Sequence, residues 1–423
     1  MAVSPVVLPA PSAREPWGHA LANRRFRSIL LGLAGVPIGL AYLWFGLVEP
    51  LVSDQPTDFV YTYLAGARVL ASGGDPYQCN VGACGGFPHY LLFYPPVAFW
   101  LTQPLVGFDS RLVSAIALVV ANIFLLAFVW LVLRALQVRD RQFALIALLA
   151  SISFAPTLTE IQNRNVQVAV LMLSAVLLMA WMRGDRWWGG VALGIGLAIK
   201  LIQAPLLLLG VWGRRFGLVA AAVAAWALLW LVAGPQFLPE YVLRVLPSQA
   251  QGSAEVINVA PLGTVNRLFH PESLYNSGRG GGVLVLAITA VFAVAVIVLT
   301  ARRLGAPRTD RDGRALELAA AVAASPLLLT LVYAGQFVLL LLPMIVLLDF
   351  GLRSQSRSLV IAVAASWLLI GPSFLAFTNA LAAGFGFPLL FQVWSNSALA
   401  GVIVLWLASL FALKRHGIEV AER

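Results

Sequence analysis

About a dozen continuous apolar runs divide this sequence, and they constrain its fold more than any other feature. A helix that crosses a bilayer needs about 20 apolar residues, and only helices or closed barrels satisfy their backbone hydrogen bonds in lipid. The strands of a membrane barrel alternate lipid-facing and lumen-facing residues, whereas these runs do not alternate. The sequence therefore predicts an all-α, polytopic integral membrane protein.

The composition agrees with that prediction and limits the size of any soluble part. Of the 423 residues, 60% are hydrophobic and 11% are charged, which leaves too little polar surface for a water-soluble globule. A dozen spanning helices use roughly 240 residues. We therefore expect one transmembrane domain over residues 28–413, with outer loops at 49–111 and 235–282, between cytoplasmic tails at 1–27 and 414–423.

The charge clusters set the orientation of the spans, because Lys and Arg concentrate on the cytoplasmic side. The clusters are Arg134/Arg139/Arg141, Arg183/Arg186, Arg214/Arg215, Arg302/Arg303/Arg308/Arg311/Arg314, Arg353/Arg357 and Lys414/Arg415. All of them fall inside if the run 187–213 crosses twice, broken near Lys200, and the run 90–106 does not cross. About 12 spans result, with both termini cytoplasmic. The net charge of +10 thus indicates orientation and not a nucleic-acid partner.

The run at 90–106 contains Tyr94, Pro95, Pro96 and Pro104, which favour a short helix at the interface over a straight span. Most remaining polar residues then fall in outer loops, so we expect any chemistry on the extracytoplasmic side. These residues are Asp54, Asp58, Arg68, Asp75, Glu160, Gln162, Asn163, Asn165, Asn258, Asn266, Arg267 and Gln336.

Two cysteines, Cys79 and Cys84, lie in a Gly-rich stretch of the first outer loop. They form either a small disulfide on the oxidising side of the membrane, which is the interpretation we favour, or two idle thiols. A metal site normally needs four ligands, and the four histidines, His19, His89, His270 and His416, show no ligand spacing. We therefore expect no metal, and no phosphate-binding loop or dinucleotide motif suggests a cofactor.

Asp58 follows the first span and opens a stretch in which Phe59, Tyr63, Gly66 and Leu70 recur at helical spacing. This spacing predicts an amphipathic helix along the outer interface, with Asp58 at its N-terminal end. Asp58 either caps this helix or acts as a general base. The two roles are compatible, because an acid fixed between water and apolar surface is both positioned and partly desolvated.

Two cations on the outer side, Lys200 and Arg267, have no topogenic role. Lys200 lies inside an apolar run, so it either extends its ammonium to the interface or binds an anion such as a lipid phosphate. Arg267 lies in the long outer loop and is a candidate for phosphate recognition. Gln162 and Asn163, with Asn165, lie at a helix mouth and either cap a helix or contact a sugar.

Four segments carry a resemblance to a known family. They are TDFVYTYLAGARVLASGGDPY with FYPPVAFWLTQPL in the first outer loop, IQNRNVQVAVLMLSA, GIGLAIKLIQAPLLLLGVWGRRFG and NVAPLGTVNRLF. In order and spacing they resemble glycosyltransferase family 87, polyprenyl-phosphate-sugar-dependent mannosyltransferases of the GT-C fold. The resemblance implies that Asp58 is the general base, that Lys200 and Arg267 lie near the donor phosphate, and that Asn258 is the loop asparagine.

One departure from the family concerns the outer end of a later span. After a Ser-Pro such as Ser325-Pro326, family members often carry a Trp and one or two His, whereas this chain reads LLLTLVYAGQFVLL. Tyr333 or Gln336 stands there instead. This difference leaves the acceptor open.

We therefore expect an inverting glycosyltransferase of the cell membrane, with its active site on the extracytoplasmic side. It would move a sugar, mannose by resemblance, from a polyprenyl-phosphate donor to a glycolipid or glycan acceptor. The expected sugar- and acceptor-binding residues are Tyr63, Tyr94, Gln162, Asn163, Asn258, Tyr333 and Gln336. A transporter or flippase, which needs polar groups along a path to both faces, and a non-catalytic scaffold, which the missing His allows, are the alternatives.

Overall fold

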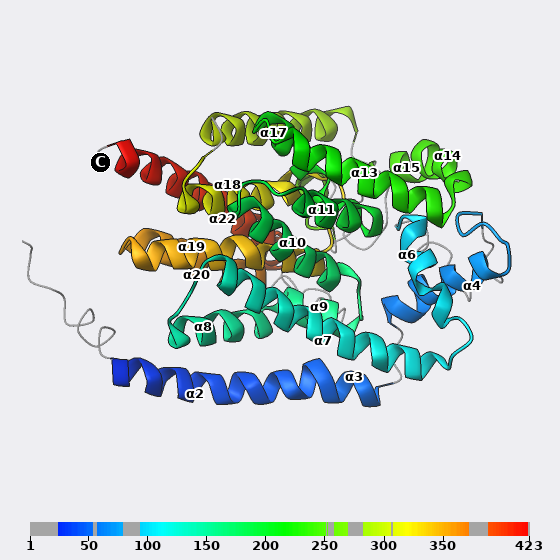
Figure 1. Ribbon diagram of the computed structural model, residues 1–423, viewed down its shortest axis with the longest axis horizontal. Helices are drawn as coiled ribbons and strands as arrows, with labels where there is room; N and C mark the ends of the chain where they lie inside the picture. The colour runs from blue at the N-terminus through cyan, green and yellow to red at the C-terminus, as the bar shows by residue number, and fades with distance from the viewer. Residues whose placement is uncertain are drawn as a thin grey trace, which may run out of the picture.

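The computed structural model describes residues 24–53, 57–78, 94–250, 252, 258–269, 282–305, 308–371 and 388–421. In these ranges every regular element is a helix, and the β-type pairing is confined to an isolated bridge between Asn258 and Tyr333. The prediction of an all-α protein is therefore confirmed for the described part of the chain. Many of its longer helices lie along one common direction, which is horizontal in Figure 1.

The helices follow one another with short breaks. In the first part of the chain they are α2 (Arg24–Leu43), η1 (Trp44–Val48), α3 (Glu49–Val52), η2 (Phe59–Leu64), α4 (Ala65–Ala71), α6 (Pro96–Thr102), η3 (Gln103–Leu105), α7 (Ser110–Ala135), α8 (Arg141–Ile152), α9 (Ala155–Gln162), α10 (Gln167–Met182), α11 (Trp187–Ile199) and η4 (Leu201–Gln203). They continue as α12 (Pro205–Trp212), α13 (Phe216–Ala233), η5 (Pro235–Phe237), α14 (Leu238–Glu240), η6 (Tyr241–Val245), α15 (Leu246–Ala250), α16 (Pro261–Phe269), α17 (Val283–Leu304), α18 (Arg311–Ala324), η8 (Ser325–Leu328), η9 (Ala334–Leu340), α19 (Leu341–Arg353), α20 (Arg357–Ile370) and α22 (Pro388–Ala421).

Six stretches of the described chain are long and apolar enough to cross a membrane. They are Leu31–Val52, Ser110–Ala135, Phe216–Ala233, Val283–Leu304, Ala334–Arg353 and Asn396–Ile418. The pair α8 and α9, bent by 59°, adds a seventh if it forms one span, and shorter apolar helices such as α10 and α11 accompany them. The helices support a membrane protein, but the predicted number of about 12 spans is not confirmed.

Two of the predicted interruptions lie where the sequence placed them. Helix α11 ends at Ile199, Lys200 is extended with φ −157° and ψ 126°, and α12 begins at Pro205. In the run 90–106, α6 is a helix of only 7 residues that begins at Pro96. A third interruption was not predicted: within the apolar run 315–332, α18 ends at Ala324, because Pro326 cannot donate the hydrogen bond that would continue an α-helix.

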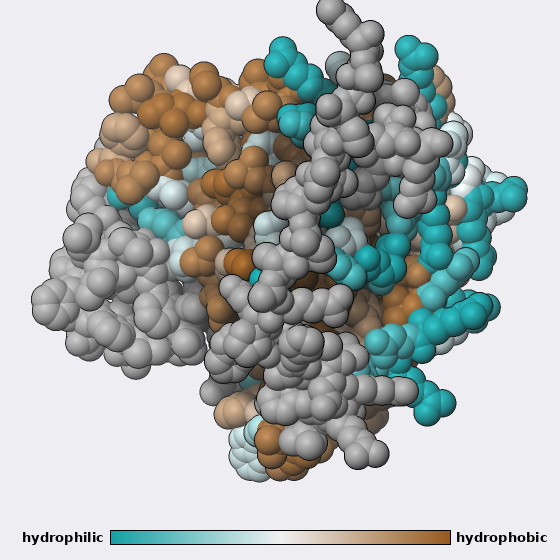
Figure 2. Space-filling model, turned by 90° about the vertical axis from the view of Figure 1, so that its left-hand side faces the viewer, coloured by the Kyte–Doolittle hydropathy of each residue, from teal (hydrophilic) through white to brown (hydrophobic). Residues whose placement is uncertain are grey.

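The basic clusters predicted to face the cytoplasm meet at one end of the bundle, on the left in Figure 1. Arg311, at the start of α18, donates to the carbonyl of Ala135 at 3.2 Å and to Gln137 at 2.8 Å, beyond the end of α7. Figure 2 looks onto this end and shows hydrophilic side chains grouped beside apolar flanks. A shared end is what topogenic charges require.

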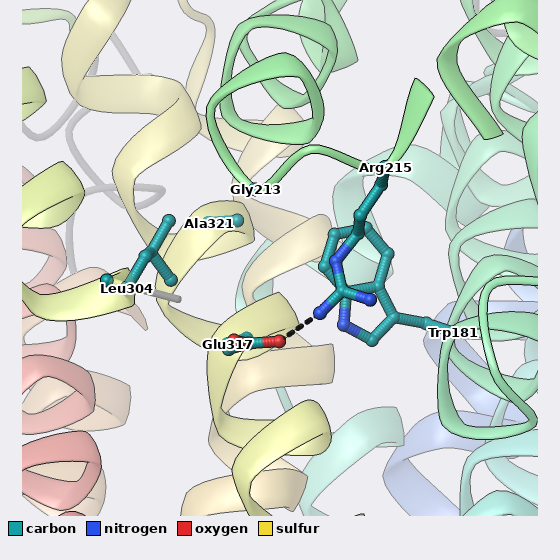
Figure 3. Close-up of a pocket in the computed structure, with 7 residues that line it drawn as sticks. Trp181, Gly213, Arg215, Leu304, Glu317 and Ala321 are labelled. Carbon is teal, nitrogen blue, oxygen red and sulfur yellow. Dashed lines mark hydrogen bonds and ion pairs between the residues drawn. The ribbon is translucent and has the colours of Figure 1, made fainter. Parts of the chain in front are cut away.

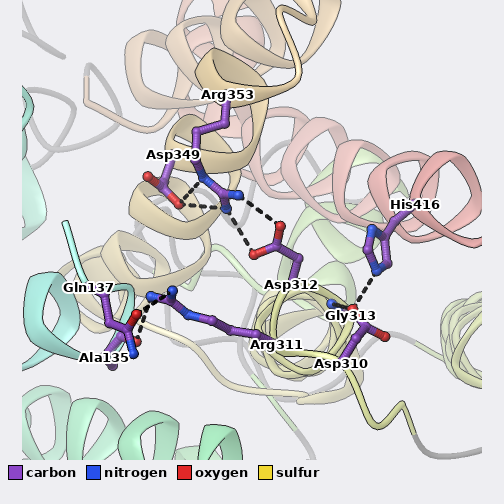
Figure 4. A network of polar contacts seen from close by, with 9 residues as sticks. All are labelled: Ala135, Gln137, Asp310, Arg311, Asp312, Gly313, Asp349, Arg353 and His416. Carbon is purple, nitrogen blue, oxygen red and sulfur yellow. Dashed lines mark hydrogen bonds and ion pairs between the residues drawn. The ribbon is translucent and has the colours of Figure 1, made fainter. Parts of the chain in front are cut away.

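Ion pairs tie the last helices together at the same end (Figure 4). Arg353 of α19 pairs with Asp312 and with Asp349, both at 2.8 Å. His416 of α22 lies 2.5 Å from Asp310, the N-cap of α18. The ends of α18, α19 and α22 are therefore fixed to one another through side chains.

A buried arginine joins two further loops to α18 (Figure 3). Arg215, before α13, pairs with Glu317 and with Asp185, and its guanidinium lies 4.0 Å from the ring centroid of Trp181. Trp181, Arg215 and Glu317 border a small pocket that is also lined by Gly213, Leu304, Gly305 and Ala321. The two ion pairs of Arg215 hold the α10–α11 and α12–α13 turns against α18.

Helix α11, which ends just before Lys200, packs closely against α13. A Cβ atom on Gly190 would lie 2.1 Å from the Leu218 carbonyl oxygen, and one on Gly194 would lie 2.3 Å from that of Ala222. The Gly-x-x-x-Gly spacing is therefore used as in other membrane helix pairs, where small residues let the backbones approach.

Candidate active site

The candidate site lies at the end of the bundle opposite the basic clusters. In Figure 1, α4 and α6 of the first outer loop lie on the right, away from the C-terminus. There the first outer loop meets the α9–α10 turn and the break after α11. Each of these segments interrupts a helix, so each leaves backbone and side chains free to form a site.

Asn165, in the α9–α10 turn, is the centre of the site. Its Nδ2 donates to Asp58 Oδ2 at 2.7 Å and to the Tyr94 hydroxyl at 3.2 Å. Its Oδ1 accepts from the Tyr63 hydroxyl at 3.1 Å and from the Lys200 ammonium at 3.4 Å. One amide therefore joins four residues that the sequence predicted for the site.

Asp58 is partly buried beside this amide and does not cap η2. Asp58 occupies the N-cap position of η2, but its side chain accepts no hydrogen bond from the N–H groups of the helix. The Thr57 hydroxyl accepts from the Val60 N–H instead, at 3.4 Å. Burial raises the pKa of the Asp58 carboxyl, and the hydrogen bond from Asn165 and the charge of Lys200 offset part of the rise. A carboxylate in this environment is suited to accept a proton.

Lys200 is buried, although it interrupts an apolar run. Its ammonium lies 3.5 Å from the Tyr94 hydroxyl and 5.1 Å from the centroid of that ring. Lys200 is only 7% exposed. The interpretation that its ammonium extends to the interface is therefore wrong. A buried ammonium whose hydrogen-bond partners, the Tyr94 hydroxyl and the Asn165 amide, are neutral is a ready partner for an anion.

Two tyrosines, Tyr63 and Tyr94, line the site beside Asn165. The rings of Tyr63 and Tyr94 meet edge to face with centroids 4.8 Å apart. Tyr63 lies on the π-helical segment η2, a form often found at functional sites. The Tyr77 hydroxyl donates to the Tyr94 carbonyl at 2.8 Å, so Tyr77 fixes the backbone that carries Tyr94.

Glu160 is a site residue that the sequence predictions missed. It is 4% exposed, and the charges that act on it most strongly are those of Lys200 and Asp58. The only signal in the sequence was a carboxylate on the outer side of an otherwise uncharged helix. Asn165 was likewise named among the outer polar residues but not chosen for the site.

Gln162 and Asn163, predicted to contact sugar, make connections between segments. Gln162 Nε2 donates to the Phe45 carbonyl at 3.2 Å, and the Asn163 carbonyl accepts from the Phe59 N–H at 3.3 Å. These bonds hold the first span and η2 against the α9–α10 turn. A role in sugar binding stays a prediction for both side chains.

Arg267 and Asn258 form a second cluster. Arg267 is fully buried and donates to the Asn258 carbonyl at 2.6 Å, to Thr264 at 3.3 Å and to Asn396 at 2.7 Å. Desolvation lowers the pKa of Arg267 to about 10, which leaves it cationic at neutral pH. Asn258 accepts from the Ala260 and Val332 N–H groups, both at 3.1 Å. Both residues thus brace the outer loop.

The segment around Tyr333 and Gln336, which stands where family members often carry His, contacts Glu160 of the site through Gly335. Tyr333 pairs with Asn258 in the isolated bridge, and its carbonyl accepts from the Gln336 N–H at 2.9 Å. Between them, Gly335 lies so close to Glu160 that a Cβ atom would be 2.1 Å from Oε1. Cys79 and Cys84, the predicted disulfide, lie outside the described residues.

Part of this chain is similar in sequence to a protein with a named activity. Over 188 residues, 42% of this chain, the sequence is 30% identical to an alpha-(1->3)-arabinofuranosyltransferase from two strains of Mycobacterium tuberculosis. The match covers 41% of the length of that relative. The chain therefore spans less than half of the relatives it matches.

A second comparison covers more of the chain. Residues 92–330, more than half of the sequence, match the profile of glycosyltransferase family 87. The match includes Tyr94, Asn165, Lys200 and Arg267 and begins after Asp58. The helical membrane architecture, the buried site and this match agree: the chain belongs to glycosyltransferase family 87.

Proposed function

We propose that this protein transfers mannose from a polyprenyl-phosphate donor to a hydroxyl group of a lipid or glycan acceptor on the extracytoplasmic side. The observation that carries the proposal is the buried amide of Asn165, which joins the Asp58 carboxylate to the Lys200 ammonium. A base and a cation held a few ångströms apart suit a reaction in which a proton leaves the acceptor while a phosphate leaves the sugar.

The chemistry is a single displacement with inversion. Asp58 takes the proton of the acceptor hydroxyl as its oxygen forms a bond to the anomeric carbon. The bond between that carbon and the phosphate oxygen breaks, and the phosphate keeps the electron pair. Lys200 stabilises the charge that builds on the phosphate. Because a lipid phosphate leaves readily, a strong general acid is unnecessary, in contrast to glycoside hydrolysis.

The two cations support this mechanism to different degrees. Lys200 is assigned to the donor phosphate because it lies beside Asp58 in the same cluster. Arg267 is assigned to the phosphate by family resemblance, and its guanidinium would have to release partners such as Asn396 to bind one. The donor sugar is also assigned by resemblance, and the partial likeness to an arabinofuranosyltransferase makes arabinofuranose the second candidate.

Transfer assays with purified protein test the proposal. Polyprenyl-phosphate-mannose and polyprenyl-phosphate-arabinofuranose are each offered with a panel of lipid acceptors, and products are identified by mass spectrometry. We expect one donor to give a glycosidic product, and Asp58→Asn to lower kcat by about 10²- to 10⁴-fold. Glu240→Gln, which removes an outer carboxylate paired with Arg244, is the matched control.

Other outcomes would exclude the proposal. Retained activity in Asp58→Asn would exclude Asp58 as the base. Movement of labelled lipid-linked sugar across proteoliposomes, without any product, would identify a transporter. Absence of both product and movement would identify a scaffold.

A further inference from the structure

Two buried side chains that border the α9–α10 turn carry polar atoms that lack a hydrogen-bond partner among the described residues. They are Oε2 of Glu160 and both amide atoms of Gln167. Glu160 is 4% exposed and Gln167 is 0% exposed. Unpaired buried polar atoms are costly and rare in folded proteins, so they mark places where a ligand or an ordered water supplies the missing bonds.

Glu160 lies within electrostatic reach of the reaction centre. The charged and titratable groups that act on it come from three other segments: Asp58 before η2 and Tyr63 within it, Tyr94 before α6, and Lys200 after α11. On the opposite side, its Oε1 rests against Gly335 of η9, where only a glycine leaves room. The remaining oxygen, Oε2, is therefore the one left for a ligand.

Gln167 lies at the level of Lys200 on the neighbouring helix. Helices α10 and α11 are antiparallel, and Val170 of α10 lies 3.7 Å from the Cβ position of Gly196 on α11. Lys200 is one turn beyond Gly196, whose carbonyl accepts the Lys200 N–H at 2.8 Å. Gln167 is one turn before Val170 on the same face of α10, which sets it opposite Lys200.

We propose that Glu160 and Gln167 form a subsite for the hydroxyl groups of the donor sugar. The proposal rests on the proposed function: a donor phosphate on Lys200 places the attached sugar ring beside that ammonium, where Glu160 and Gln167 lie. A carboxyl group accepts hydrogen bonds and an amide both accepts and donates them, which matches neighbouring ring hydroxyls. Neither side chain carries a positive charge, so the two offer no ionic partner for a second phosphate.

Donor analogues that each lack one ring hydroxyl test this subsite. In the wild-type enzyme, loss of a contacted hydroxyl should lower kcat/KM by about 10- to 100-fold, because the charged or amide partner is left unpaired. In Glu160→Leu or Gln167→Met the same loss should lower kcat/KM by less than about 3-fold, because the partner is already gone. If Glu160→Leu does not fold, Glu160→Gln keeps the shape and should give an intermediate dependence.

Asn122→Leu is the matched control. Asn122 is a half-buried amide on α7 with partners on both atoms, because its Nδ2 donates to the Leu118 carbonyl at 2.9 Å and its Oδ1 accepts from the Tyr42 hydroxyl at 2.6 Å. This variant should keep the wild-type dependence on the deleted hydroxyl, even if its stability falls. A simple loss of packing would affect all donors equally and would not change that dependence.

Two results would overturn the subsite and leave the proposed function in place. Unchanged dependence on the donor hydroxyls in both Glu160 and Gln167 variants would show that the polar atoms hold only water. Dependence on acceptor hydroxyls instead would assign the residues to the other substrate. In both cases the wild-type enzyme is active and the proposed function stands, whereas a wild-type enzyme that uses no lipid-linked sugar would refute the proposed function itself.

Discussion

The amide of Asn165 separates Asp58 from Lys200, with Nδ2 on the carboxylate at 2.7 Å and Oδ1 toward the ammonium at 3.4 Å. Among the described contacts no direct ion pair joins the two charges. A direct pair would satisfy the carboxylate and the ammonium with each other, whereas this arrangement leaves each with capacity for a substrate. Asn165 thus holds Asp58 and Lys200 in position for a substrate, which can supply the remaining hydrogen bonds of both groups.

Replacing Asn165 should therefore disable the site without unfolding the protein. Asn165→Leu removes the hydrogen bonds to Asp58, Tyr63, Tyr94 and Lys200, and displacements of about 1 Å can cost about 100-fold in rate. We expect kcat to fall by about that factor. Asn122→Leu, which loses an interhelical bond to Tyr42 at 2.6 Å and a bond to the Leu118 carbonyl at 2.9 Å, should keep its activity per folded molecule. Equal activity losses in the two variants would contradict the role given to Asn165.

The pH dependence of transfer should report Asp58. Because a base acts when ionised and burial raises the pKa of Asp58, activity should fall as the pH drops through that raised value. Lys200 lowers this pKa, so Lys200→Met should raise it further and move the acidic limb of the kcat profile to higher pH. Lys200→Arg keeps the charge and should keep the limb in place. A limb that stays fixed or moves to lower pH in Lys200→Met would contradict the assignment.

A methyl group at Gly335 should disturb Glu160. The added Cβ would lie 2.1 Å from Oε1, so the carboxylate must move. We expect Gly335→Ala to lower kcat/KM by about 10-fold, in line with the loss of one hydrogen bond to a charged group. The comparison is Gly107→Ala, where a Cβ meets nothing within 4 Å. Wild-type kinetics in Gly335→Ala would show that the position of Glu160 does not matter.

The hydroxyl of Tyr77 should act through Tyr94. Tyr77→Phe keeps the ring in its aromatic cluster but removes the bond to the Tyr94 carbonyl at 2.8 Å, worth about 1 kcal/mol. We expect kcat/KM to fall by about 3- to 10-fold. Tyr241→Phe changes a ring 5.7 Å from that of Tyr77 and should have little effect on transfer. Identical kinetics in the two variants would exclude this positioning role.

At the opposite end, Arg215 should contribute to stability and not to catalysis. Arg215→Met removes the guanidinium from the buried Glu317 carboxylate, which keeps only the Arg308 N–H at 2.8 Å, and loss of one member of a buried ion pair typically costs about 3–5 kcal/mol. We expect a lower midpoint of thermal unfolding in detergent and normal activity per folded molecule. The double variant Arg215→Met/Glu317→Leu should recover most of the loss, because no carboxylate is left buried there. A double variant less stable than Arg215→Met would contradict this explanation.

The sequence predicted some contacts and not others for identifiable reasons. Tyr63, Tyr94 and Lys200 were predicted for the same site as Asp58, and the structure brings all three to Asn165, although Tyr94 and Lys200 lie far from Asp58 in the chain. Their roles stay predictions. Gln162 and Asn163 were chosen over Asn165, because all three are polar residues of one short turn and the sequence does not show which one faces inward. The backbone reverses there, with Arg164 at φ 50°, and sets Asn165 toward Asp58.

The sequence by itself determined the all-α membrane architecture, the break at Lys200 and the common end of the basic clusters. Hydropathy, proline and charge act locally, so each can be read from a short stretch of chain. Only the tertiary structure decided that Asn165 links Asp58 to Lys200, that Glu160 joins them, and that Arg267 braces a separate cluster. These relationships depend on helix phase and on the register between α10 and α11, and they join residues as far apart as 107 and 129 positions.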